Sequence, residues 1–472
     1  MTWLYLHFRH LLLDHIARSR HETGPLAVLS QGTRQVLQAC PQARELGIQP
    51  GMALKTALNL APELAMVHAD DARQGEILEQ QAHWLYRYMD RIALHPPDGL
   101  LAEAASVQRL YGDLESLRRQ LQQALDERQL NATLTTGTTP LSARLLARAR
   151  VQCCTGEASH MAGQLEALPL AHAGFDDRTL QRLTRLGLTT LGQVFRLPAP
   201  ELARRLAPET LAYVQRLQGQ RPDPQTSWQP PHYFRQRADF GLPVEKTQGL
   251  LFALQRMLSE LESDLQWRQQ DTDSLLLILH HYRREPSRLR VRTTGPEHRA
   301  DAFLSLLRIR LEQHPLRAPV ETLELKVTRF LDRQAVTHTD LLGETTDPGE
   351  AWHTLVSRLQ ARLGEQALNH LAPAADHRPE RAWSARSLTT GHHSHDRAVA
   401  HLPLRPLWLL PHPSPLDTTP EAWLSSPERI SGGWWDGARV MRDYYIARLA
   451  TGQLAWVYRD NQQNWFVHGW FG

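Results

Sequence analysis

Two carboxylates, Asp98 and Glu103, stand in a short apolar stretch and are the first candidates for chemistry. Pro97-Asp98-Gly99 is typical of a turn, and Leu100–Val107 is mostly apolar, which predicts a strand at the centre of a sheet. A carboxylate on a buried strand is costly unless it is paired or binds a metal. The pattern therefore allows a metal site, but Asp98 as a turn cap and Glu103 as a solvent-facing side chain fit equally well.

Cysteine chemistry offers little. Cys40, Cys153 and Cys154 form neither a disulfide framework nor a Cys-x-x-Cys metal pair. We expect the adjacent Cys153 and Cys154 to be buried as small apolar side chains.

The composition is that of an ordinary globular protein, with 42% hydrophobic and 22% charged residues among 472. This length predicts several domains, because single cores stop growing at roughly 250–300 residues. Three lysines leave arginine to carry nearly all the positive charge, which suits phosphate recognition but also follows from GC-rich coding. His7, Arg9 and His10 interrupt the apolar N-terminus, so we expect no signal peptide or membrane span and a cytoplasmic protein.

The strand that would lie beside the carboxylates is expected at the N-terminus. Trp3–Phe8 is aromatic and alternating, which predicts a strand, yet the first acidic residue of the chain is Asp14. The elements expected around these two strands are a short helix ending at Gly47, helices over 53–60, 73–91, 114–128 and 141–150, and a strand over 131–139.

The order of these features resembles the palm and fingers of the Y-family translesion DNA polymerases. The supporting residues are Ala43-Arg44-x-x-Gly47-Ile48-x-x-Gly51-Met52, a long helix, the carboxylate-bearing strand, Gly137-x-x-Pro140 and a basic helix. The sequence is most similar to their ImuB-type relatives, bacterial mutagenesis proteins that keep the polymerase fold and are regarded as catalytically dead. The resemblance covers essentially the whole chain.

This resemblance implies an α+β multidomain protein. We expect Y-family polymerase-like palm and fingers, a helix-hairpin-helix thumb, a βαββαβ little finger and a small β-rich C-terminal domain. The predicted boundaries are 1–164 for palm and fingers, 165–224 for the thumb, 225–239 for a linker, 240–331 for the little finger, 332–400 for a second linker with a helix, and 401–472 for the Trp-rich C-terminal domain.

Catalysis in that family is two-metal phosphoryl transfer, which needs several carboxylates from neighbouring palm strands. The family places an aspartate in the first strand, where Trp3–Phe8 offers no suitable ligand for Mg²⁺. It places an Asp-Glu pair at Asp98-Gly99, so the second acid is lost, and Glu103 matches a more peripheral acidic position. We therefore expect no catalytic residue, no metal and no cofactor. The alternative is a residual polymerase that uses Asp98 and Glu103.

Arg44 matches the finger arginine that contacts the incoming triphosphate in active relatives. The tyrosine expected three residues earlier is Pro41, so a structural role is the favoured interpretation of this former nucleotide-contact position. The basic helix after Pro140 corresponds to a lysine-bearing helix of active enzymes and has arginines instead.

Two regions are predicted to contact DNA. Leu183–Val194 is expected to form a helix, a turn and a helix, in which backbone N–H groups from Gly187 to Gly192 hold a phosphate; a hairpin that packs only on its own domain is the alternative. Phe240–Phe330 is predicted to follow the order strand, helix (247–267), strand (274–281), strand (289–293), helix (299–313) and strand (322–328). Its predicted backbone contacts are Arg283, Arg284, Arg288, Arg290 and Arg292, beside Tyr282. A charged, solvated edge strand is the alternative.

A clamp-binding motif is expected after the little finger. Family members carry a Gln-Leu-Asp-Leu-Phe type of peptide there, and this sequence has His338-Thr339-Asp340-Leu341-Leu342. Such a peptide binds by burying its terminal apolar pair. His338 and Leu342 depart from the pattern, so we expect weaker binding, and an ordinary linker is the alternative.

The composition changes sharply beyond residue 400, where seven of the thirteen tryptophans lie. Short strands joined by Gly and Asn turns are predicted. Aromatic side chains can fill a small core, but so many are expected to leave some exposed for protein binding. The predicted partner-binding residues are Trp434, Trp435, Tyr444, Tyr445, Trp456 and Trp465.

The resemblance implies a non-catalytic accessory protein of SOS-induced, error-prone translesion DNA synthesis. Its expected partners are damaged or primed DNA, the β sliding clamp, the RecA-like protein ImuA and an error-prone replicative-type DNA polymerase subunit. A nucleic-acid-binding module unconnected with the clamp is the second alternative.

Overall fold

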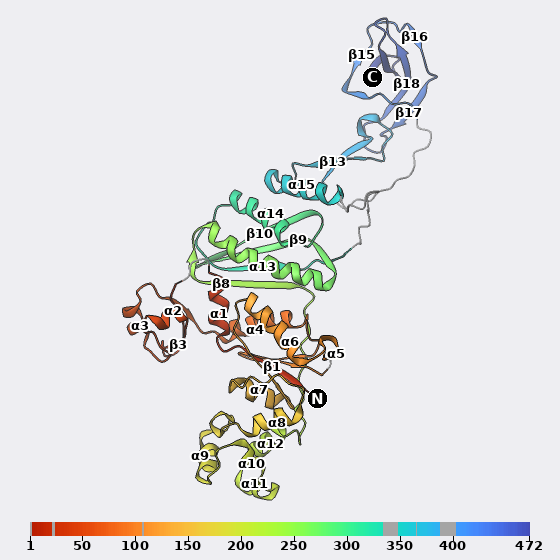
Figure 1. Ribbon diagram of the computed structural model, residues 1–472. Helices are drawn as coiled ribbons and strands as arrows, with labels where there is room; N and C mark the ends of the chain where they lie inside the picture. The colour runs from red at the N-terminus through yellow and green to blue at the C-terminus, as the bar shows by residue number, and fades with distance from the viewer. Residues whose placement is uncertain (1, 21–23, 106–107, 334–347, 365, 388–402) are drawn as a thin grey trace. The chain divides into compact units, whose positions relative to one another are not determined.

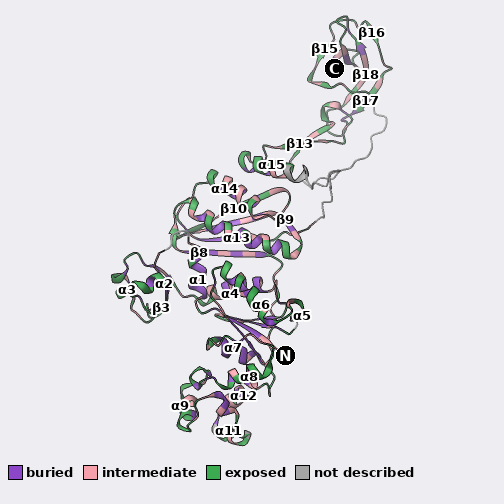
Figure 2. Ribbon diagram, in the orientation of Figure 1, coloured by how far each residue is buried: buried purple, intermediate pink, exposed green. Residues whose placement is uncertain are grey.

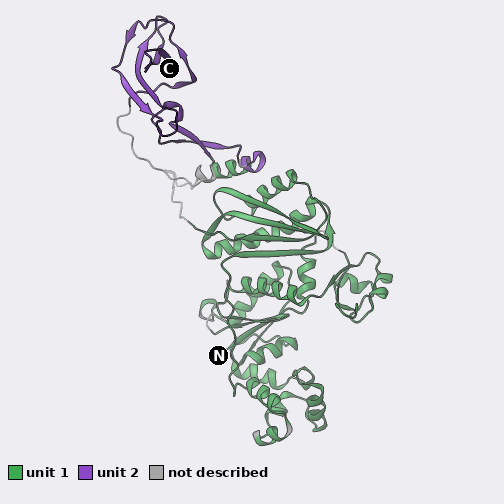
Figure 3. Ribbon diagram, turned by 180° about the vertical axis from the view of Figure 1, so that it is seen from behind, with its two compact units in different colours: residues 1–358 green, residues 359–472 purple. Residues whose placement is uncertain are grey.

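The computed structural model describes residues 2–20, 24–105, 108–333, 348–364, 366–387 and 403–472 (Figure 1). The chain forms two compact units, residues 1–358 and 359–472, coloured green and purple in Figure 3. Within the described ranges, no helix is both long and apolar enough to cross a membrane.

An antiparallel sheet of order β5-β6-β1-β7, here called the N-terminal sheet, organises the first part of unit 1. Its strands are β1 (Trp3–His7), β5 (Ile92–His95), β6 (Gly99–Glu103) and β7 (Thr133–Gly137). Tyr5 pairs with Leu101 on one side and Thr135 on the other, so β1 lies inside the sheet. The two strands predicted at Trp3 and Leu100 are confirmed, but β6 ends at Glu103, earlier than expected.

Alternation along β1 divides its side chains between two cores. The covering helices are α1 (Leu11–Ala17), α4 (Asp71–Leu85), α6 (Leu114–Glu127) and α7 (Pro140–Arg148). Leu4 and Leu6 lie in a core with residues of α1, α4 and α6. Tyr5 lies in a separate cluster with Ala143 and Ala147 of α7. The sheet is therefore covered on both faces, and Tyr5 is on the face under α7.

A smaller sheet of order β3-β2-β4 follows in residues 26–68. Its elements are β2 (Leu26–Leu29), β3 (Val36–Ala39), α2 (Pro41–Glu45), α3 (Leu54–Leu60) and β4 (Ala65–His68). Gly47 and Gly51 have φ of +87° and +88°, which glycine adopts without steric cost. They form the predicted turn between α2 and α3.

Residues 158–217 are helical and share one core. The elements are α8 (Ala158–Glu166), η1 (Leu170–His172), α9 (Asp177–Arg185), α10 (Leu191–Phe195), α11 (Ala199–Arg205) and α12 (Pro208–Leu217). The short helix α5 (Gln108–Tyr111) is not part of this region, since it lies between β6 and α6. The predicted helix, turn and helix from Leu183 to Val194 are present as α9 and α10.

A second antiparallel sheet of order β10-β9-β11-β8, here called the central sheet, follows. Its elements are β8 (Phe234–Val244), α13 (Thr247–Arg268), β9 (Gln270–His281), β10 (Arg284–Glu297), α14 (Ala300–Gln313), β11 (Val320–Val327) and β12 (Leu331–Asp332), which pairs with β9. This is the predicted βαββαβ order. Buried and intermediate residues alternate along much of β8 (Figure 2). Because β8 begins at Phe234, the segment 225–239 is not all linker.

Unit 2 contains the end of α15 (Pro348–Leu363), a β-hairpin and a C-terminal sheet of order β15-β20-β19-β18-β16, in which β17 also pairs with β18. The elements are β13 (Asn369–Pro373), η2 (Pro379–Arg381), β14 (Trp383–Ser387), β15 (Trp408–Pro415), β16 (Ala422–Trp423), β17 (Glu428–Gly432), β18 (Val440–Arg448), β19 (Leu454–Asp460) and β20 (Trp465–Trp470). The predicted β-rich C-terminal region and the α+β class are confirmed.

Candidate functional site

One end of the N-terminal sheet gathers the residues that sequence reasoning places in a former active site. Asp98 lies directly before β6, and its carboxylate is 3.4 Å from Nε2 of His7 and 3.0 Å from Nη2 of Arg148. Burial raises the pKa of Asp98, but hydrogen bonds from His7 and Arg148 outweigh burial and hold it below its usual value. The surviving acid is therefore an ionised partner of two basic side chains.

The space beside Asp98 is filled by Tyr5. A Cβ atom on Gly99 would lie 1.8 Å from the Tyr5 hydroxyl and 2.4 Å from Cζ, far inside van der Waals contact. Burial raises the pKa of Tyr5 to about 12, although Arg144 and Arg148 act in the opposite direction. A neutral phenol therefore occupies the position that a second acid on residue 99 would need. Sequence reasoning did not single out Tyr5 as a site residue.

Glu103 lies at the other end of the same strands, where it pairs with Trp3. Four residues of extended chain separate it from Gly99, which is about 13 Å at 3.3 Å per residue. Its carboxylate is 2.8 Å from Nη1 of Arg91. Asp98 and Glu103 therefore lie too far apart to hold together one metal centre in which two ions are about 4 Å apart.

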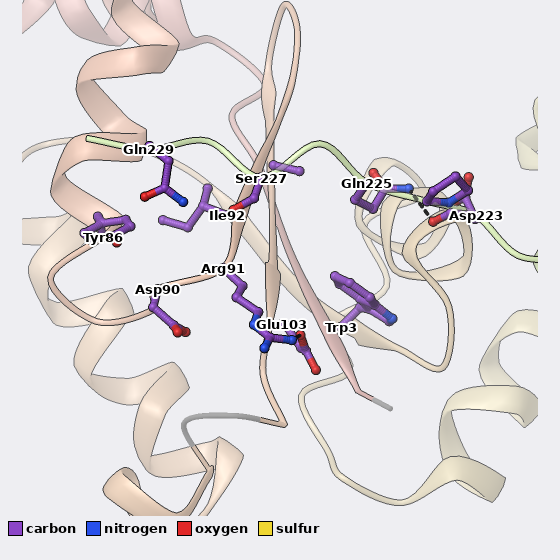
Figure 4. A pocket seen from close by; sticks show the side chains of 12 residues that line it. Trp3, Tyr86, Asp90, Arg91, Ile92, Glu103, Asp223, Gln225, Ser227 and Gln229 are labelled. Carbon is purple, nitrogen blue, oxygen red and sulfur yellow. Dashed lines mark hydrogen bonds and ion pairs between the residues drawn. The ribbon is translucent and has the colours of Figure 1, made fainter. Parts of the chain in front are cut away.

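Glu103 instead lines a hollow of about 570 Å³ at the edge of the sheet, shown in Figure 4. Trp3 and Arg91 line it from the sheet, and Tyr86 and Asp90 from the end of α4 and the turn that follows. The chain segment that leads into β8 closes one side, where the N–H of Trp228 donates to the carbonyl of Ile92 at 2.7 Å. These residues define an open groove between two chain segments rather than a metal site.

Metal-binding clusters are absent from the described ranges: no group of three or more His, Cys, Asp or Glu side chains is placed to hold an ion. Arg44, predicted to be a former nucleotide-contact position, lies on α2 near His10. Burial is the largest cause of the lowered pKa of His10, and the charge of Arg44 adds to it. Arg144 and Arg148 act on Tyr5 and Asp98 at this end of the sheet, and their positive charge opposes binding of divalent cations.

The arginines predicted to contact DNA lie on β10, at the edge of the central sheet. Arg288, Arg290 and Arg292 are spaced two residues apart and lie on one face, while Leu289 and Val291 between them are buried. Arg283 and Arg284 lie at the turn that precedes this row. The five predicted residues therefore share one strand and its turn.

The predicted phosphate site between α9 and α10 is not supported. Three of its backbone donors have carbonyl acceptors in the chain: Gly187 N–H donates to Thr184, Leu188 N–H to Leu183, and Leu191 N–H to Leu168. Thr189 and Thr190 N–H both donate to the side chain of Gln193. Gly192 is buried, and a Cβ atom there would lie 2.9 Å from Cβ of Glu166. Gly192 therefore permits a close helix contact, and Gly187, with φ of +77°, forms the turn; a hairpin that packs on its own domain was the alternative prediction.

The other predicted contact residues belong to the clamp-binding motif and to unit 2. His338, Asp340, Leu341 and Leu342 lie outside the described residues. Trp434 and Trp435 are exposed, and Tyr445 and Trp465 are partly buried.

Tyr444 and Trp456 are 1% and 2% exposed and stack at a ring-centroid distance of 4.0 Å. Their assignment as partner-binding residues is wrong, because both side chains form the core of the C-terminal sheet.

The sequence did not lead us to predict a buried cluster of charged side chains around Asp239. Asp239 of β8 accepts from Nε and Nη2 of Arg73, on α4, at 2.9 and 2.7 Å, and from the Thr322 hydroxyl at 2.7 Å. Arg237 contributes Nε at 3.2 Å, and Nε2 of His15 lies 3.6 Å away. These five residues, the Asp239 cluster, join the central sheet to α1 and α4. The signal in the sequence was an acid between Ala238 and Phe240 in an alternating strand.

Comparison with known proteins gives the following matches. The impB/mucB/samB family model matches residues 14–148. The chain is 23% identical over 478 aligned residues to "Protein ImuB" of Caulobacter vibrioides, which covers 90% of this chain and 100% of that protein. It is 27% identical over 175 residues to "DNA polymerase IV" of Dehalococcoides mccartyi, which covers 36% of this chain and 45% of that protein.

Two solved structures are also similar, each at 16% identity. DinB from Sulfolobus solfataricus covers 71% of this chain and 100% of its own, with a TM-score of 0.38. The post-insertion binary complex of Dbh DNA polymerase covers 70% and 99%, with a TM-score of 0.40. TM-scores below 0.5 do not support an argument about function, so the relationship rests on the sequence matches.

Proposed function

Because the chain is an ImuB-type homologue with a Y-family polymerase-like domain, we propose that it is a non-catalytic accessory protein of error-prone translesion DNA synthesis. In this role it binds damaged or primed DNA and brings together the β sliding clamp, an ImuA-type RecA-like partner and an error-prone replicative-type polymerase subunit. The proposal includes induction by DNA damage and a cytoplasmic location. The proposal includes the predicted palm, thumb, little-finger and C-terminal regions. The little finger is proposed to start at Phe234, where β8 begins, rather than at residue 240.

The observation that carries the absence of catalysis is the space occupied by Tyr5. Two-metal transfer needs a cluster of oxygen ligands. Asp98 is already bonded to His7 and Arg148, and position 99 has no room for an acid while Tyr5 is in place. The groups around Asp98 favour its ionised form without any metal.

The arginine row on β10 supports the DNA-binding part of the proposal. Each phosphate contact made by an arginine releases counterions, so log K falls with log salt by about 0.9 per contact on duplex DNA. Changing Arg288, Arg290 and Arg292 together to Ala is expected to weaken binding and to lower that slope by up to about 3. Fluorescence anisotropy over a salt series measures both quantities. An unchanged slope would place the DNA on another surface.

The clamp contact is tested separately. Clamp peptides bind through a terminal apolar pair, which in this chain is Leu341 and Leu342. We expect immobilised full-length protein to recover the clamp, and the double change Leu341→Ala, Leu342→Ala to abolish recovery. Equal recovery by both proteins would remove this motif from the proposal.

The exposed tryptophans of unit 2 are the proposed contact for a protein partner. Trp434 and Trp435 lie in the turn after β17, and Arg378 lies 5.6 Å from the Trp435 ring centroid. Several weak contacts on one chain raise the effective concentration of the partners at a stalled primer end. The double change Trp434→Ala, Trp435→Ala should reduce recovery of the polymerase subunit without reducing recovery of the clamp.

A further inference from the structure

The turn between β9 and β10 places an aromatic ring at the end of the arginine row. His281 pairs with Arg284, so Tyr282 and Arg283 alone connect the two strands. The Tyr282 side chain is 52% exposed, and Cζ of Arg283 lies 4.9 Å from its ring centroid. A large aromatic side chain thus lies at the surface, with a cation on its ring and a row of cations on the next strand.

The surrounding contacts hold this turn in place. Arg283 has φ of +52°, a conformation that residues with a Cβ atom rarely adopt. His281 is fixed on both ring nitrogens, with Nδ1 2.9 Å from the carbonyl of Ala318 and Nε2 2.8 Å from the Ser287 hydroxyl. Nη1 of Arg284 donates to the carbonyl of Arg317 at 3.3 Å. The turn therefore presents Tyr282 and Arg283 from a fixed base, and the positive φ of Arg283 is one that two-residue hairpin turns use.

The other face of the central sheet cannot present this ring. Helices α13 and α14 contact β8, β9 and β10, and Leu277 and Val291 are buried in the layer between the helices and the sheet. Arg288, Arg290 and Arg292 alternate with the buried residues, so they lie on the opposite face. Tyr282 lies two residues before the start of β10, with Arg284 and the exposed Glu285 between it and the row that begins at Arg288.

We propose that Tyr282 is a stacking site for an unpaired nucleobase, while the β10 arginines hold phosphates of the same strand. Bases in a duplex are stacked on one another, so a protein at its surface meets phosphates and groove edges. A single strand exposes the face of each base, and aromatic side chains bind it by stacking. The ligand class is therefore DNA with a single-stranded segment, as at the end of a primed template. The inference rests on the proposed function, since DNA must reach the central sheet.

The test compares a labelled oligo-dT single strand with a blunt duplex of equal length, using full-length protein and fluorescence anisotropy. Tyr282→Ala is expected to weaken single-strand binding about 10-fold and duplex binding less than about 2-fold. Its salt slope should stay unchanged, because no charge is removed. Tyr282→Phe keeps the ring and is expected to bind like the unaltered protein.

A matched control is available on the same sheet. Tyr233 precedes β8, is also exposed, and has Nζ of Lys326 5.7 Å from its ring centroid. Its strand begins opposite Val327, at the end of the sheet away from the Tyr282 turn. Tyr233→Ala should leave the ratio of single-strand to duplex affinity unchanged.

Three results would overturn the inference: unchanged single-strand binding by Tyr282→Ala, equal loss on both DNAs, or a loss with Tyr282→Phe as large as with Tyr282→Ala. If the unaltered protein binds neither DNA, the DNA-binding part of the proposed function fails as well. If the unaltered protein binds DNA and the Tyr282→Ala protein binds the single strand with the same affinity, this inference alone fails.

Discussion

Asp98 and Asp239 are both carboxylates surrounded by histidine and arginine, but their burial differs. The Asp98 side chain is 25% exposed and bonded by two basic groups. The Asp239 side chain is 0% exposed, and the rest of the Asp239 cluster surrounds it. Asp98 lies directly before β6 in the N-terminal sheet, and Asp239 lies where β8 meets α1 and α4.

Ion pairs of similar residue types contribute differently to stability, depending on how far they are exposed to solvent. A half-exposed ion pair contributes little to stability because water screens and solvates both partners. Breaking a fully buried pair leaves an uncompensated charge and is strongly destabilising. The stability of unit 1 should therefore depend on Asp239 much more than on Asp98.

The largest effect is expected from Asp239→Asn. This change keeps the shape of the side chain but removes the charge that Arg73 and Arg237 face in the interior. We expect the free energy of unfolding of unit 1 to fall by about 3–5 kcal/mol, measured by urea denaturation. A loss below about 1 kcal/mol would show that the cluster is dispensable.

Acid should weaken the same cluster. Burial lowers the pKa of His15 to about 4, against a partial opposing effect of Asp239, while the charges of Arg18 and Arg256 lower it further. The unfolded state therefore binds more protons than the folded state between about pH 6.5 and 4, so stability falls as pH falls through that window. Protonation of His15 in the unfolded state lowers the free energy of unfolding by about 3 kcal/mol at pH 4. Urea denaturation of His15→Gln should show a pH slope about one proton shallower; an equal slope would contradict this assignment.

Gly99→Glu tests the filled space beside Asp98. The new Cβ atom would meet the Tyr5 hydroxyl, so we expect a loss of about 1–3 kcal/mol from overpacking. Adding Tyr5→Ala removes the obstructing ring, and the double variant should tolerate the glutamate better than Tyr5→Ala and Gly99→Glu predict by addition. Simple additivity in thermal unfolding would show that the two side chains do not compete.

Asp98→Asn is the matched counterpart of Asp239→Asn and should have the smallest effect. Its partners Arg148 and His7 are close enough to water to be solvated when the charge is lost. We expect a change of about 0–1 kcal/mol in the same denaturation experiment. A loss as large as that of Asp239→Asn would remove the contrast between the two sites.

Local patterns predicted the elements, and long-range contacts decided the sites. The alternating run at Trp3 gave β1, and the apolar periodicity over 247–267 gave α13 (Thr247–Arg268) almost to the residue. Sequence reasoning also found that β1 has no acid. It did not find that the Tyr5 hydroxyl fills the space beside Gly99, because this depends on the pairing of β1 with β6 and on the cover of α7.

The same limit applies to two sets of predicted binding residues. Gly187 and Gly192 are typical of a phosphate-binding turn. However, the carbonyl of the distant Leu168 and the side chain of Gln193 on α10 accept hydrogen bonds from N–H groups of this turn. Tyr444 and Trp456 are as aromatic as Trp434, and only the pairing of β18 with β19 and β20 determines which rings are buried. Composition gave the kind of residue, and tertiary packing gave its role.

Primer extension measures whether this polymerase-like fold catalyses nucleotide transfer. Full-length protein is incubated with a primed template, all four deoxynucleoside triphosphates and Mg²⁺ or Mn²⁺, with Asp98→Ala in parallel. We predict no extension above background by either protein, since Asp98 is bonded to His7 and Arg148 and Tyr5 fills the adjoining space. Robust incorporation that Asp98→Ala abolishes would contradict the account.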